Sequence, residues 1–192
     1  MNNKLRLELG REARNGHYEK SPMGILFPRA GLMVGGIFTH DVIRNGVSMG
    51  EQSDPNIVCN EGLNALLGIM FNAATQITTW YVAPFEGNYT PVAGVTAATI
   101  TADSTESTAY DEATREAYVE AAPSGQSITN SASKADFTIN AGKTIYGAFL
   151  ASASAKSATT GTLFAASRFS ASRSVIALDS LLITYTITAA DA

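Results

Sequence analysis

The sequence predicts an all-β protein: a jelly-roll-like β-sandwich with one short amphipathic helix and an extended N-terminal arm. Three observations support this class. Apolar and polar residues alternate over several short runs. β-Branched and aromatic side chains fill those runs, and Gly, Ser and Asn separate them. Only 16% of the 192 residues are charged, well below the usual quarter, and small uncharged residues take their place.

The clearest strands are expected between about residues 135 and 189. Four runs stand out: 135–140, 144–151, 162–169 and 181–188. Residues 140–142 (Asn-Ala-Gly) suit a tight turn and predict a hairpin between the first two runs. We expect the four runs to form one antiparallel sheet with one buried face. An earlier part of the chain would supply the opposing sheet.

The last of these runs shows the alternation best. Leu181, Ile183, Tyr185 and Ile187 share one face, and Leu182, Thr184 and Thr186 share the other. A strand with this period of two buries one of its faces.

Residues 1–30 differ from the rest and predict an extended basic arm, with the β domain spanning 31–192. Gly and Pro recur in the arm and predict no regular element there. Leu5, Leu7 and Leu9 alternate, which suits one strand added to the sheet edge of a neighbour. A frayed terminus is the alternative.

The rest of the chain supplies weaker strands and one helix. A strand at 35–44 is followed by Asn45-Gly46, a strong hairpin signal. The helix is expected near 61–72, with Asn60 as its N-cap and an apolar stripe that must pack on a sheet or a partner. That stripe consists of Leu63, Leu66, Leu67, Met70 and Phe71.

Residues 49–55 and 103–111 are expected to be polar connections, and 123–133 a further loop. Strands are expected at 78–85 and, with a weaker pattern, at 95–101, and residues 113–119 are expected to form either a strand or a helical turn. The total is about eight strands and one helix. Trp80 and Tyr81 should point to opposite faces, one toward the core and one toward solvent.

Motifs that would carry chemistry are weak. Gly142-Lys143-Thr144 resembles the end of a phosphate loop, but the earlier glycine is replaced by Phe137, so Lys143 is expected at a hairpin tip. His17 and His40 lack the clustered partners of a metal site and are expected at the surface or an interface. Cys59 is expected to be a small buried hydrophobe.

Acidic residues gather between residues 103 and 120. A glycosidase would need two of them in one cleft, but a solvated loop or a partner for a neighbour's basic arm is favoured. They are Asp103, Glu106, Asp111, Glu112, Glu116 and Glu120. We therefore predict no enzyme, no catalytic residue, no cofactor and no metal.

Net charge and segment lengths restrict the partners. The formal net charge of −4 argues against nucleic acid, whose phosphates require a basic face. No segment has the run of about 18 apolar residues that crosses a bilayer, so no membrane partner is expected. No secretory signal is recognised, which predicts synthesis in a cytoplasm.

The order of several runs resembles minor structural or capsid-decoration (cement) proteins of tailed bacteriophages. The runs are 56–64 with 66–67, 80–82, 110–115, 130–132, 137–139, 147–150, 161–163 and 179–185. The resemblance implies a jelly-roll-like domain on the outside of the phage head that stabilises contacts between major capsid protein subunits. It implies no catalytic or ligand residue.

Two further expectations complete this interpretation. A symmetric β body favours a homo-oligomer, a dimer or a trimer. The alternative function is a tail-associated structural or host-attachment (carbohydrate-binding) protein, in which Trp80, Tyr81, Tyr89 and Tyr110 would be exposed for sugar stacking.

Overall fold

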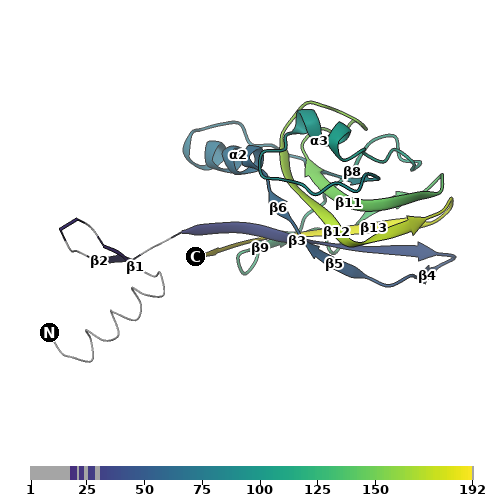
Figure 1. The fold of residues 1–192 in the computed structure, drawn as a ribbon, viewed down its shortest axis with the longest axis horizontal. Helices are drawn as coiled ribbons and strands as arrows, with labels where there is room; N and C mark the ends of the chain where they lie inside the picture. The colour runs from purple at the N-terminus through teal and green to yellow at the C-terminus, as the bar shows by residue number, and fades with distance from the viewer. Residues whose placement is uncertain (1–17, 21, 24–25, 29–30, 192) are drawn as a thin grey trace, which may run out of the picture. The chain divides into compact units, whose positions relative to one another are not determined.

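The structure, a computed structural model, describes residues 18–20, 22–23, 26–28 and 31–191 (Figure 1). The chain divides into two compact units, residues 1–34 with 189–192 and residues 35–188. In the first unit β1 (Tyr18–Lys20) pairs antiparallel with β2 (Leu26–Pro28). The prediction of no regular element before residue 30 is wrong for this hairpin. Apart from residues 22–23, the other residues of the predicted arm, His17 and the three leucines included, lie outside the described part.

The larger unit is built on two antiparallel sheets, which confirms the all-β sandwich; jelly-roll connectivity stays a prediction. The six-stranded sheet has the order β10-β13-β3-β4, with β5 paired to β3 and β9 to β13. Its strands are β3 (Leu32–Arg44), β4 (Val47–Ser48), β5 (Gln52–Pro55), β9 (Ser127–Thr129), β10 (Ala135–Thr138) and β13 (Ser180–Asp191).

The five-stranded sheet has the order β6-β12-β11-β7-β8. Its strands are β6 (Ile57–Val58), β7 (Tyr81–Phe85), β8 (Glu116–Ala117), β11 (Lys143–Ala151) and β12 (Leu163–Val175). Side chains meet between the sheets: His40 of β3 stacks on Phe169 of β12 with ring centroids 3.6 Å apart. The core is dominated by such aromatic and β-branched residues, and Cys59 lies in it fully buried, as predicted.

All four strands expected between 135 and 189 are present, but they do not form one sheet. β10 pairs with β13 in the six-stranded sheet, whereas β11 pairs with β12 in the other. The predicted hairpin across residues 140–142 is therefore wrong, because that segment crosses from one sheet to the other. Both faces of β11 are buried from Gly147 onward, where a one-sided strand was expected.

The Asn45-Gly46 hairpin is confirmed. Asn45 and Gly46 have φ values of 50° and 77°, the left-handed pair that a two-residue turn uses to match strand twist, and β3 pairs with β4 across them. The polar connection expected at 49–55 is wrong, since β5 within it pairs with β3 from Ile37 to His40.

Two helices are present in the described residues, one more than predicted. α2 (Asn60–Phe71) ends as expected, but its N-cap is Cys59, with no side-chain cap bond, and not Asn60. α3 (Ala97–Asp103) replaces the weak strand expected at 95–101, because Thr96 and Thr99 form a reciprocal capping box.

Two loops also differ from expectation. The supposedly solvated segment 103–111 holds buried Ser104, Glu106, Ser107 and Tyr110. The segment 123–133 contains β9. Trp80 and Tyr81 do not divide between core and solvent: both are half-buried, and Trp80 meets Phe164 edge to face at 5.5 Å.

Candidate interaction surface

Three of the six acidic residues between 103 and 120 accept hydrogen bonds from within the chain. Glu106 is buried in a bidentate pair with Arg115, at 2.9 and 2.7 Å. Glu112 accepts the Thr138 N–H, and Asp111 accepts from the Asn140 amide. Asp103, Asp111 and Glu120 are exposed, as a solvated loop predicts, whereas Glu106 is buried and departs from that prediction. Contact between the remaining acids and a neighbour's arm stays a prediction.

His40 contradicts the expectation of a surface or interface histidine. Its side chain is fully buried, with Nε2 3.0 Å from Asp54 Oδ2. Burial lowers its pKa, an effect that the nearby Arg173 charge reinforces and Asp54 and Asp41 oppose. Cys59 is not an activated nucleophile. Burial, and second the Glu61 charge, raise the pKa of its thiol to about 12.

Lys143 and the four aromatic candidates occupy other positions than predicted. Lys143 begins β11 and donates to a Glu86 carboxylate oxygen at 2.9 Å. Tyr110 is buried against Phe137, so it offers no face for sugar stacking. Trp80, Tyr81 and Tyr89 are half-buried. In the described part of the chain, no three His, Cys, Asp or Glu side chains gather closely enough to hold a metal ion.

Exposed apolar side chains instead lie on two turns that the Arg44–Asp179 pair joins at one end of the sandwich. We call them the turn patch. They come from the β3–β4 hairpin and from the turn between β12 and β13. They are Val47, Met49, Ile176 and Leu178. Leu178 is the extreme case: 88% of its side chain is exposed, and its φ of 72° lies in the left-handed region that leucine rarely adopts.

The turn that carries Leu178 is tightly braced. Asp179 is buried, and its carboxylate accepts both Nε and Nη2 of Arg44, at 2.9 and 2.7 Å, and the Ile176 N–H at 2.8 Å. The Arg44 contacts, followed by the Ile176 N–H, outweigh burial and lower the pKa of Asp179. The Leu178 N–H donates to Ile139 O at 2.7 Å. The backbone that carries the exposed leucine is thus fixed by hydrogen bonds before any partner arrives.

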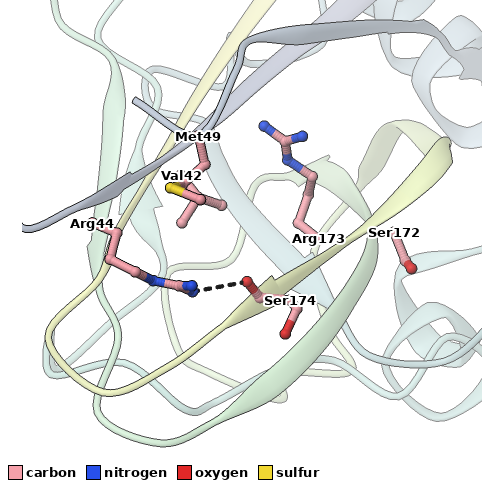
Figure 2. Close-up of a pocket in the computed structure, with 6 residues that line it drawn as sticks. All are labelled: Val42, Arg44, Met49, Ser172, Arg173 and Ser174. Atoms are coloured by element: carbon pink, nitrogen blue, oxygen red, sulfur yellow. Dashed lines mark hydrogen bonds between the residues drawn. The ribbon is translucent and has the colours of Figure 1, made fainter. Parts of the chain in front are cut away.

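A small hollow lies beside the turn patch (Figure 2). It has a volume of about 110 Å³ and is lined by Val42, Arg44, Met49, Ser172, Arg173 and Ser174. Figure 2 shows Arg44 of β3 reaching the Ser174 carbonyl of β12, a bond of 3.2 Å that joins the two sheets. None of the acids between residues 103 and 120 lines this hollow.

A second apolar surface lies on α2, which we call the helix patch. It consists of Leu63, Leu67, Met70 and Phe71, which are 36, 51, 64 and 77% exposed. The helix packs through the other side, where Gly62 is buried and Ala65, Leu66 and Ile69 are half-buried. Most of the apolar stripe predicted to pack inward therefore faces solvent. Figure 1 places α2 and the β4 turn at different ends of the sandwich.

Sequence reasoning missed the turn patch because an apolar residue is assigned to the core by default. The one available signal was the position of Val47 directly after the Asn45-Gly46 turn, where a side chain is held away from the sheet body. No such signal marked Leu178, because the turn that carries it is braced by Arg44, a residue far away in the sequence.

A scan against models of known protein families finds no match, and a search of curated proteins finds none either. Neither helix in the described residues has the length and apolar character needed to cross a membrane.

Proposed function

We propose that this chain is a virion structural protein of a tailed bacteriophage. It acts as a capsid decoration (cement) protein that is made in the host cytoplasm, binds the outside of the head and stabilises contacts between major capsid protein subunits. The turn patch is the observation that carries this proposal. A loop that is already fixed loses less conformational entropy when it binds a partner, so its exposed apolar side chains bind with higher affinity.

Three features support a binding role for this surface. Backbone strain of the kind found at Leu178 costs free energy and persists where function requires it. Exposed apolar residues around charged Arg44 match the mixed composition of an interface between separately folded proteins. Many identical copies on a head lattice make each modest contact effective.

The tail-associated or host-attachment alternative gains no support from a particular residue, and buried Tyr110 weakens its sugar-stacking version. The direct test is to mix the purified full chain with separated heads and tails of the phage that encodes it, and to follow co-sedimentation. Recovery with heads supports the proposal. Recovery with tails favours the alternative, and a chain that never leaves the supernatant overturns both.

Leu178→Gly should separate stability from binding. Glycine adopts a positive φ without a Cβ penalty, and the exposed leucine loses little packing, so we expect stability to rise by about 0.5–1 kcal/mol. Head binding should nevertheless weaken about tenfold, or about 1.4 kcal/mol, because the anchor is gone. Urea unfolding and quantitative co-sedimentation measure the two effects.

The matched control is Val119→Gly, at an exposed apolar residue outside the turn patch. It should leave head binding unchanged and should not gain stability. If Leu178→Gly binds heads as well as the wild type, the turn patch is not the contact surface.

Deletion of residues 1–30 should lower head occupancy about tenfold while the β domain keeps its melting temperature within a few degrees. Occupancy should fall because basic residues of the arm add contacts to neighbouring subunits. The melting temperature should stay because the larger compact unit begins only at Gly35. Gel quantification of purified particles, with circular dichroism of the free chain, makes the comparison. Unchanged occupancy would remove the arm from the mechanism.

A further inference from the structure

In the part of the chain that the structure describes, the helix patch is largely exposed. The first turn of α2 lies tightly against β12, because an added Cβ at Gly62 would lie 2.5 Å from Phe164 O. One Glu61 oxygen accepts N–H groups from Ala97 and Leu163, each at 2.9 Å. These contacts anchor the start of the helix and hold the Glu61 carboxylate toward the interior of the domain. The remaining turns present Leu67, Met70 and Phe71 to solvent.

The chain segment that carries this stripe has no charged residue after Glu61. From Gly62 to Phe85 the sequence contains no Asp, Glu, Lys, Arg or His, and the exposed residues that follow the helix, Asn72 to Gln76, are small or polar. The turn patch differs, since the Arg44–Asp179 pair joins the two turns that carry it. Depletion of charge together with a higher apolar share is typical of contacts between identical subunits.

The spacing of the stripe also suits a two-fold contact. Leu63 and Phe71 each lie four residues from Leu67, about 6 Å along a helix that rises 1.5 Å per residue. When two such helices pack antiparallel about an axis at Leu67, each Leu63 faces the Phe71 end of the other helix. The same patch then complements itself, as an isologous interface requires.

We propose that the helix patch joins two copies of this chain into a two-fold dimer, with the α2 helices antiparallel and Leu67 opposite Leu67. A neutral surface meets an identical one here without like-charge repulsion. The proposed dimer does not depend on the proposed function. A chain that dimerises but does not bind phage heads would support the dimer and contradict only the proposed function. The turn patches of both subunits stay free for other partners.

Sedimentation equilibrium of the full chain, at concentrations from about 1 to 100 μM, tests the proposal. The wild type should be a dimer. Leu67→Glu and Leu67→Lys should each weaken dimerisation at least tenfold, because like charges then face each other across the axis. A one-to-one mixture of the two variants should restore a dimer, because residue 67 then meets an opposite charge.

Val47→Glu is the control, since it adds the same charge to an exposed apolar residue of the turn patch; it should stay dimeric. If a charged variant at position 67 does not fold, Phe71→Ser should weaken the dimer at a side chain that is 77% exposed. A monomeric wild type, a dimer insensitive to these changes, or a mixture that stays monomeric overturns the proposal. If the wild type is monomeric and Leu67→Glu loses head binding, the helix patch is the surface that contacts the capsid shell.

Discussion

Arg115→Leu is expected to lower the free energy of unfolding by about 3–5 kcal/mol, the largest single effect in the molecule. Both side chains of the Arg115–Glu106 pair are 1% exposed. Removing one partner of a buried pair leaves the other charge without compensation, and this loss costs several kcal/mol. Arg115 also donates to Ala153 O and Ala158 O, at 3.0 and 3.1 Å, and so ties together separate loops. Urea unfolding followed by tryptophan fluorescence measures the loss.

A double variant tests the cause. Replacing Glu106 as well as Arg115 by leucine removes the stranded carboxylate, so the double variant should be more stable than Arg115→Leu alone. Lys143→Met breaks the partly exposed pair with Glu86 and should cost less than about 1 kcal/mol. Equal losses in Arg115→Leu and Lys143→Met would show that burial does not strengthen the first pair.

The strands were predictable where one physical constraint acts on consecutive residues. Leu181, Ile183 and Tyr185 are fully buried in β13, as their period of two requires. The Asn45-Gly46 turn was equally clear, because few residues accept the backbone angles it needs. Both signals are local, so they can be interpreted without knowledge of the rest of the fold.

Sheet membership was not predictable from the same signals. Alternation sets which side chains share a face, but it does not say which strand lies alongside. β10 and β11 are separated by a turn-forming segment, yet their partners are β13 and β12, on different sheets. β3 pairs with β5 although Gln52–Pro55 holds mostly polar residues, because Asp54 and His40 satisfy one another in the interior.

The helix illustrates a second limit. Counting large apolar residues favours the side of Leu63, Leu67 and Met70 as the buried one. The structure buries Gly62 instead, because the absence of a side chain lets the helix approach Phe164 of β12. Pattern reasoning weighs side chains and so overlooks a contact made by the backbone. The same error hid the helix patch.

The pH dependence of stability should expose the buried His40. Its folded pKa lies below the ordinary value of 6.5, first because of burial and then because of the Arg173 charge. The unfolded chain therefore binds the proton more readily, and stability that is present above pH 6.5 is lost as the pH falls toward the folded pKa. One proton gives a slope of at most about 1.4 kcal/mol per pH unit. Between pH 7.5 and 5 we expect a loss of up to about 2 kcal/mol in urea unfolding.

The geometry explains why this protonation is costly and how to isolate it. Asp54 accepts both the His40 N–H and the Ser170 N–H of the opposite sheet, while His40 Nδ1 is buried with no partner among the described residues. A second proton would sit on that nitrogen without an acceptor, and the nearby Asp54 and Asp41 offset only part of the cost.

His40→Gln keeps an N–H for Asp54 and should lose the slope, whereas His17→Gln should keep it. Glu116 acts in the opposite direction, because burial and then the Glu112 and Asp136 charges raise its pKa. The difference between the wild-type and His40→Gln curves removes this shared contribution. If that difference does not change between pH 7.5 and 5, then the proton equilibrium of His40 is not coupled to folding, and the buried His40–Asp54 contact acts only as a hydrogen bond.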